Sequence, residues 1–176
     1  MAKAYIIGNG PSLTPALLES LDGETWAVNR IWKIYHRTTW RPNNYVRAEL
    51  PSYDEKTVLE DLRAVCKYEC VIWAHDGFRA YARSVWNKSN PWTRWEFFET
   101  CDGTKRHNWH LPLICGYGTV VHIAAQLAIK NGADEICFVG CDLGTEHFYP
   151  GEDFTNEKLA KVAHKIAERN AQVTYG

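Results

Sequence analysis

Residues 1–13 read M-A-K-A-Y-I-I-G-N-G-P-S-L, and the fold can be worked out from this stretch. Residues 4–7 form a short, unbroken apolar run, which is typical of a buried strand. The Gly-Asn-Gly-Pro sequence that follows cannot continue a strand, because glycine favours positive φ and proline lacks an N–H group. Ser12 or Thr14 can cap a helix that begins near Pro15. The stretch therefore predicts a strand, a tight glycine turn and a helix N-terminus.

This glycine turn is a candidate phosphate site. Backbone N–H groups converge where a glycine turn enters a helix, and the helix dipole adds positive potential. The residues predicted to line the site are Gly8, Asn9, Gly10, Pro11 and Ser12. The turn is not a Walker A loop, since no Gly-Lys-Ser/Thr follows, and Leu13 stands where a dinucleotide fingerprint needs its third glycine. The alternative is an ordinary strand–helix turn without a ligand.

Composition and charge restrict the class of protein. The chain has 176 residues, 45% apolar and 23% charged, as in one globular domain. A formal net charge of −1 gives no strong nucleic-acid signal, because a general duplex-DNA binder needs a basic surface. No apolar run is long enough for a membrane span, so a cytoplasmic protein is expected. The six cysteines are expected to be thiols, with Cys115, Cys137 and Cys141 buried.

Strand and helix patterns alternate along the chain. Apolar runs predict strands at 4–7, 25–28, 45–48, 70–74, 135–140 and 171–175, and residues 111–115 lead into the glycine turn at 116–119. Helical spacing predicts helices at 15–21, 31–35, 54–66, 78–86, 120–131 and 156–169. This order predicts an α/β fold, with a mostly parallel sheet and helices on both faces. We expect one domain over residues 1–176, with an irregular Trp-rich insertion at about 87–112.

Polar residues and glycines lie at the ends of several predicted strands or soon after them. They are Asn29, Arg30, Arg47, Glu49, Asp142 and His147, joined by Gly116, Tyr117, Gly118 and Thr119 at a second helix start. In a parallel sheet all of these positions share one edge, where ligands bind in open α/β folds. Two glycine-bearing helix starts and asparagine amides suit a nucleotide, because amides both donate and accept hydrogen bonds. The alternative is that these are ordinary polar strand ends.

His147 is the predicted general base or acid, because it lies in a loop after a strand-end aspartate and histidine titrates near neutral pH. A surface-loop histidine is the alternative. Cys101, His107, His110 and Cys115 have a spacing that matches no common zinc module. No metal site is therefore predicted.

Three stretches together resemble a known family: I-I-G-N-G-P-S-L at 6–13, A-V-N-R at 27–30 and G-Y-G-T-V-V-H-I-A-A-Q-L-A-I-K-N-G-A-D-E-I-C-F-V-G-C-D-L at 116–143. They resemble the bacterial sialyltransferases that modify lipooligosaccharide. The wider superfamily includes motility-associated glycosylation factors and an archaeal 6-hydroxymethylpterin diphosphokinase. The resemblance covers roughly residues 5–29 and 116–175 and implies a Rossmann-like fold.

The resemblance also implies roles for particular residues. The residues implied to line a cytidine nucleotide are Gly8, Asn9, Gly10, Ser12 and Asn29, with 116–119 near its phosphate or sugar. His147 would act as base and Tyr149 would stabilise the leaving phosphate, with Asp142 beside them. The loop that carries His147 is shorter here than in the sialyltransferases.

The resemblance therefore implies a transferase that moves a sugar, of sialic-acid type or other, from a CMP- or NDP-sugar to an unknown acceptor, without a required cofactor. One alternative, implied by the pterin diphosphokinase branch, is an ATP-dependent pyrophosphokinase that needs Mg²⁺, held by Asp142 or Glu49. Another is a non-catalytic nucleotide-binding or interaction protein, with the aromatic stretch 90–98 as partner surface. The sequence does not decide whether the protein forms a homo-oligomer.

Overall fold

A computed structural model describes residues 1–48, 55–80, 82, 93–101, 111–115, 119–142 and 147–149. The strands are β1 Lys3–Ile7, β2 Glu24–Val28, β3 Asn44–Arg47, β4 Val71–His75, β5 Arg94–Cys101, β6 Leu113–Cys115 and β7 Glu135–Val139. The α-helices are α1 Pro15–Glu19, α2 Glu55–Val65 and α4 Val120–Lys130, and two 3₁₀-helices are η1 Asn29–Ile34 and η2 Asp76–Phe78. The helix predicted at 156–169 and the strand predicted at 171–175 lie outside the described residues.

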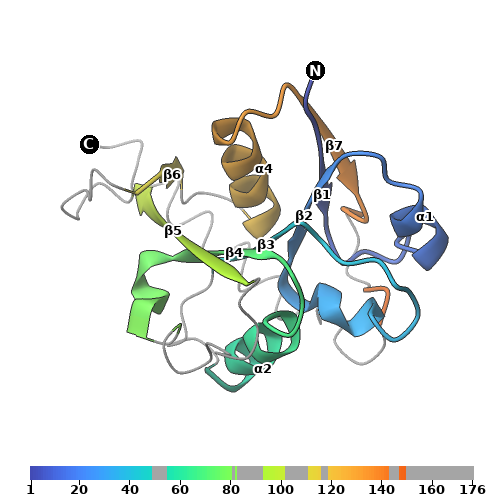
Figure 1. Ribbon diagram of the computed structural model, residues 1–176, viewed down its shortest axis with the longest axis horizontal. Helices are drawn as coiled ribbons and strands as arrows, with labels where there is room; N and C mark the ends of the chain where they lie inside the picture. The colour runs from blue at the N-terminus through green and yellow to red at the C-terminus, as the bar shows by residue number, and fades with distance from the viewer. Residues whose placement is uncertain are drawn as a thin grey trace, which may run out of the picture.

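The seven described strands form one parallel sheet in the order β6-β5-β4-β3-β2-β1-β7 (Figure 1). Ile7, at the end of β1, pairs with Ala27 of β2 on one side and with Val139 of β7 on the other. The chain therefore winds outward from β1 to β6 and then returns to the other side of β1. Such a reversal creates a topological switch point between β1 and β7.

Alternate residues of each strand supply two separate cores. Ala4 and Ile6 of β1 face the core that α4 covers, together with Trp26 of β2. Tyr5 and Ile7 face the other core, which contains residues of α1, η1 and α2. Figure 1 shows α4 on one face of the sheet and α2 on the opposite face. The predicted α/β fold, with a parallel sheet between helices, is confirmed.

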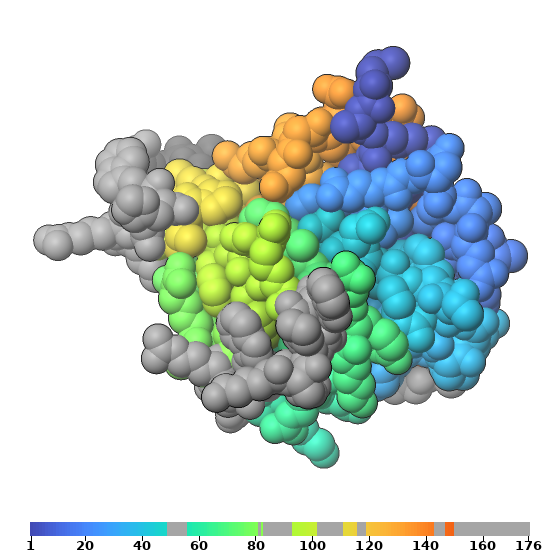
Figure 2. Space-filling model, in the orientation of Figure 1, coloured from blue at the N-terminus to red at the C-terminus, as the bar shows by residue number. Residues whose placement is uncertain are grey.

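Two segments that are far apart in the sequence, β1 and β7, lie side by side in the sheet. The backbone N–H of Asp134 donates to the carbonyl of Ala2 at 2.8 Å, and the N–H of Ala2 donates to Oδ2 of Asp134 at 2.9 Å. Figure 2 shows the orange β7 region packed beside the dark blue N-terminal strand. Contacts between distant segments therefore build this part of the sheet.

Two sequence-based expectations are wrong. Residues 94–101, inside the stretch expected to be irregular, form the eight-residue strand β5, which pairs with β4 and β6. All six cysteines are free thiols, as predicted, but Cys115 is exposed and Cys137 and Cys141 are only partly buried. They are less buried than expected because β6 and β7 lie at the edges of the described sheet, where fewer elements cover them.

Within the described residues, no helix combines the length and apolar character that crossing a bilayer requires.

Candidate functional site

The carboxyl ends of β7, β1, β2 and β3 meet beside the switch point, which is where ligands bind in open α/β sheets. The sequence-predicted residues that the structure brings to this edge are Gly8, Asn9, Gly10, Asn29, Arg30, Arg47 and Asp142. The residues Glu49, Gly116, Tyr117 and Gly118 lie outside the described part of the chain. The candidate site is therefore built mainly by β1, β2 and β7.

The backbone of the glycine turn is already hydrogen-bonded. The N–H of Gly8 donates to Val139 O at 2.9 Å, and the N–H of Gly10 donates to Gly140 O at 2.7 Å. The N–H of Ser12 donates to Oδ2 of Asp142 at 3.2 Å. These bonds tie the turn to the end of β7, so the same N–H groups are not available to a phosphate in this conformation.

The side chain of Asp142 occupies the space that the glycine turn encloses. Its Oδ2 also accepts from Oγ of Ser12 at 2.8 Å. A Cβ at Gly10 would overlap this carboxylate, so glycine is required for the close approach. Pro11 is exposed beside them. The carboxylate therefore takes the place that the sequence pattern suggests for a phosphate, and Asp142 fixes the shape of the turn.

Asn9 carries a buried acceptor at the switch point. Its Nδ2 donates to Val28 O at 3.1 Å, which ties β1 to the end of β2. This bond assigns the amide, because a carbonyl can only accept. Its Oδ1 is buried and accepts no hydrogen bond within the described part of the chain. Because an unsatisfied buried acceptor is unfavourable, the site is suited to a ligand that donates to this oxygen.

Asn29, at the next strand end, has an unusual backbone. Its φ is 49°, the only positive φ among the described residues other than glycine. Nη1 of Arg47 donates to its Oδ1 at 3.1 Å. Asparagine adopts the left-handed region more readily than most residues, and a fixed side chain helps to hold it there.

Arg47 in turn belongs to a buried ion pair. Its Nη1 lies 3.0 Å from Oδ2 of Asp61 in α2, and the two side chains are 4% and 0% exposed. Nε1 of Trp32 donates to Oδ1 of Asp61 at 2.7 Å. Burial raises the pKa of the Asp61 carboxyl, although the Trp32 hydrogen bond and the Arg47 charge oppose this shift. The buried ion pair is therefore in direct contact with Asn29, through Nη1 of Arg47.

Tyr149 and His147 form an aromatic stack at the same edge. Their ring centroids are 5.0 Å apart and nearly parallel, and Nζ of Lys33 lies 4.2 Å from the centroid of the Tyr149 ring. The N–H of Phe148 donates to Asn9 O at 3.0 Å, which attaches this segment to the glycine turn. Burial raises the pKa of Tyr149 to about 12, against the lowering effect of the Arg30 charge. The phenol is therefore a hydrogen-bond donor at neutral pH.

Two other predicted site residues already have partners. Nη2 of Arg30 donates to Oγ1 of Thr57 in α2 at 3.1 Å. The N–H of Thr119, at the start of α4, donates to Nδ1 of His122 at 3.3 Å, which is a helix-capping contact. In the described portion of the chain, no three His, Cys, Asp or Glu side chains are grouped so as to hold a metal ion.

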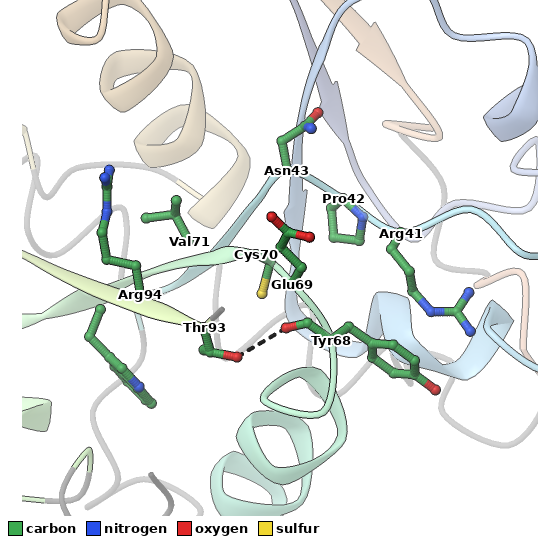
Figure 3. Close-up of a pocket in the computed structure, with 10 residues that line it drawn as sticks. Arg41, Pro42, Asn43, Tyr68, Glu69, Cys70, Val71, Thr93 and Arg94 are labelled. Carbon is green, nitrogen blue, oxygen red and sulfur yellow. Dashed lines mark hydrogen bonds between the residues drawn. The ribbon is translucent and has the colours of Figure 1, made fainter. Parts of the chain in front are cut away.

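A hollow of about 950 Å³ lies at the opposite edge of the sheet (Figure 3). Asn43, Cys70 and Thr93, which line it, directly precede β3, β4 and β5. The guanidinium of Arg41 lies 4.2 Å from the ring centroids of both Tyr35 and Tyr68. None of the sequence-predicted site residues lines this hollow. The switch-point edge therefore remains the better candidate, since it combines the buried acceptor with the reversal of strand order.

The comparisons with known proteins add a structural relationship. No protein-family model matches the sequence, and no curated protein is significantly similar to it. A solved structure of the MAf glycosyltransferase from Magnetospirillum magneticum AMB-1 is similar, with a TM-score of 0.65 and 13% sequence identity. The alignment covers 88% of this chain and 24% of that protein, so this chain spans about a quarter of it. At this identity the similarity shows a shared fold.

Sequence reasoning missed Asp61, Trp32 and Lys33. The one available signal is Asp61, which comes three residues after Val58 and directly before Leu62 on the apolar side of a predicted helix. A carboxylate on a buried helix face needs a partner, and Arg47 at the end of β3 supplies it. The Lys33–Tyr149 contact has no such signal, because the two residues are far apart in sequence.

Proposed function

We propose that this chain binds a nucleotide-sugar at the switch-point edge and transfers the sugar to an acceptor hydroxyl. The observation that carries the proposal is the buried Oδ1 of Asn9, which accepts no hydrogen bond from the described residues, at the point where the strand order reverses. Nδ2 of the same side chain donates to the carbonyl of Val28, the residue before Asn29. Ribose hydroxyls and base amines are donors that would satisfy that oxygen. The fold shared with a MAf glycosyltransferase supports the same class of reaction. A CMP- or NDP-linked donor, with a sialic-acid or other sugar, is proposed.

The proposed mechanism is a direct displacement. His147 takes the proton of the acceptor hydroxyl as its oxygen forms a bond to the anomeric carbon. The bond from that carbon to the phosphate oxygen breaks, and the electron pair leaves with the phosphate. Tyr149 is protonated at neutral pH, as a tyrosine ordinarily is, and burial raises its pKa further to about 12, so its phenol can donate to the departing phosphate. Asp142 holds the glycine turn through Ser12 and is a positioning residue in this mechanism.

The first stage of the test measures nucleotide binding. Thermal unfolding is followed with CMP, CDP, UDP, GDP and ATP, each with and without Mg²⁺. A nucleotide at 100 times its Kd should add about 2.7 kcal/mol to the free energy of unfolding. Asn9→Ala should abolish this increase. Asn131→Ala is the matched control, because its Nδ2 also donates to a backbone carbonyl, at 2.8 Å, but at the end of α4.

The second stage measures turnover. The nucleotide that binds is supplied as its sugar conjugate, and release of the free nucleotide is followed with simple sugar acceptors. His147→Ala should lower the rate at least tenfold while nucleotide binding is kept, whereas exposed His36→Ala should leave the rate unchanged. Binding of ATP with strict dependence on Mg²⁺ would instead favour a phosphotransferase. A wild-type protein that no nucleotide stabilises would contradict the proposal.

A further inference from the structure

We propose that the buried Arg47–Asp61 ion pair is a positioning device that holds Asn29 in its left-handed conformation and presents its Nδ2 to the ligand as a donor. The inference rests on the proposed function, because it concerns how the nucleotide is recognised. Arg47 and Asp61 would not touch the ligand themselves. They would act through Asn29.

The partner of Asn29 determines which end of its amide is presented. A guanidinium has only N–H donors, so the atom that Nη1 of Arg47 contacts at 3.1 Å must be the amide oxygen. The Nδ2 group then faces away from the ion pair. Within the described residues it donates no hydrogen bond, so it is available to an acceptor on a ligand. A guanidinium has no acceptor to offer the amide N–H₂ group, so this orientation does not invert.

The ion pair itself is held from several sides. Asp61 comes from α2, Arg47 from the end of β3, and Trp32 from η1, which begins at Asn29. The bond from Trp32 to Asp61, at 2.7 Å, therefore links the carboxylate back to the helical turn that follows Asn29. Trp32 thus holds Asp61, Asp61 pairs with the guanidinium of Arg47, and that guanidinium donates to the amide of Asn29. Rigid support of this kind keeps a recognition group in its binding geometry before the ligand arrives.

The resulting site has one hydrogen-bond acceptor and one hydrogen-bond donor, each on a known residue. Asn9 presents a buried acceptor and Asn29 presents a donor, and the two residues are linked because Nδ2 of Asn9 donates to the carbonyl of Val28. The complementary ligand group carries a donor and an acceptor side by side. In a nucleotide, either the two ribose hydroxyls or the base edge has this pattern. Comparison of each ribonucleotide with its 2′-deoxy form distinguishes these two sources.

The test removes the ion pair without leaving a buried charge. Arg47→Met combined with Asp61→Asn is neutral and keeps an acceptor for Trp32, so folding is expected to survive. Affinity for the best-binding nucleotide should fall roughly five- to tenfold, as expected for one misplaced hydrogen bond. The single variant Arg47→Lys keeps a donor and a positive charge at this position, so it should retain most of the wild-type affinity. Arg94→Met combined with Glu96→Gln, at the exposed ion pair on β5, is the matched control and should bind normally.

A double-mutant cycle tests whether the ion pair acts through Asn29, by comparing removal of the pair in the wild-type and Asn29→Gly backgrounds. In an Asn29→Gly background, removal of the pair should change the affinity less than twofold. A further fivefold loss in that background would overturn the proposal. Asn29→Asp keeps the oxygen that Arg47 contacts but lacks the amide donor, so it should bind weakly while its melting temperature is unchanged. Normal nucleotide affinity in Asn29→Asp would also overturn the proposal.

A measurement without nucleotide separates this inference from the proposed function. In NMR spectra of the ligand-free protein, the side-chain amide of Asn29 should give one fixed pair of signals that moves to random-coil positions when the ion pair is removed. If those signals stay fixed, the positioning role is wrong whatever the protein binds. If they move and wild type binds no nucleotide, the ion pair holds Asn29 but the proposed function fails.

Discussion

At the scale of single residues, two glycines allow the ends of β1 and β7 to approach each other. A Cβ at Gly8 would overlap the carbonyl oxygen of Gly140, and a Cβ at Gly10 would overlap the carboxylate of Asp142. The obstacles differ, because a side chain can be removed by substitution and a backbone carbonyl cannot. The same two contacts bring Asn9 and Ser12 to the switch point, so local packing and the candidate site depend on the same positions.

This difference predicts two kinds of mutant. Gly8→Ala and Gly10→Ala should each lower the free energy of unfolding by about 1–3 kcal/mol, because they overpack a close contact. Asp142→Ala removes the two bonds from Ser12, so it is itself destabilising. Combined with Gly10→Ala it should lower the free energy of unfolding by less than the sum of the two single losses, whereas its loss should simply add to that of Gly8→Ala. Denaturant unfolding measures both effects. Gly132→Ala is the control for backbone strain without overpacking. An added Cβ at Gly132 meets no atom within 4 Å, so only the positive φ is strained there, and Asp142→Ala should not change its effect. Simple addition of the losses in both the Gly8→Ala and the Gly10→Ala backgrounds would show that Asp142 is not the obstacle at Gly10.

Sequence reasoning located the glycine turn, yet it assigned the backbone N–H groups to a ligand. Those groups are taken by Val139, Gly140 and Asp142, which lie about 130 residues away in the sequence. Spacing within a motif carries no information on which distant atoms complete it. Asn9 and Asn29 were predicted to contact a nucleotide because they follow strands. The structure places Asn9 after the end of β1 and Asn29 directly after the end of β2. Whether they bind a nucleotide stays a prediction.

At the scale of elements, most strands could be predicted because parallel strands buried on both faces are short apolar runs. β5 was missed because it lies near the end of the described sheet and mixes charged and aromatic residues, as in Arg94–Glu96. Its position is set partly by Thr93, just before it. Oγ1 of Thr93 is 3.1 Å from Cys66 O, just after the end of α2. It is also 3.0 Å from Tyr68 O, and Figure 3 shows this second contact. One buried hydroxyl therefore ties β5 to the end of α2.

Thr93→Val should lower the free energy of unfolding by about 1–2 kcal/mol, because buried carbonyls lose their donor while the side-chain shape is kept. Thr93→Ser retains the hydroxyl and serves as the matched variant, with a smaller loss from the missing methyl group. Urea unfolding of both variants checks the prediction. A serine variant that is less stable than the valine variant would mean that packing, and not the hydrogen bond, is what matters at Thr93.

At the scale of the whole molecule, burial decreases from the central strands toward β7. β3 is fully buried, whereas the residues of β7 are exposed or only partly buried, with Phe138 54% exposed. Phe98 of β5, by contrast, is completely buried and belongs to the core under α4. The stability of the sheet therefore depends mainly on its interior strands.

Truncation of the two phenylalanines should reveal this gradient. Phe98→Ala should lower the free energy of unfolding by about 3–5 kcal/mol, because it leaves a cavity in the core. Phe138→Ala should change it by less than about 1 kcal/mol, since much of that ring is already in water. Chemical denaturation of the two variants measures the difference. A large loss for Phe138→Ala would show that its ring is covered in the folded protein in solution.

The position of β1 between β2 and β7 also affects the order in which the chain is made. A ribosome releases β2, β3 and β4 soon after β1, so these strands can pair while the chain is still being synthesised. β7 follows β1 by about 130 residues, a delay on the order of ten seconds at typical rates of translation. During that interval one side of β1 is a bare strand edge, and the glycine turn lacks its partners. The wall of the candidate site that β1 and β7 share is therefore completed after the strands from β1 to β4 have had time to assemble.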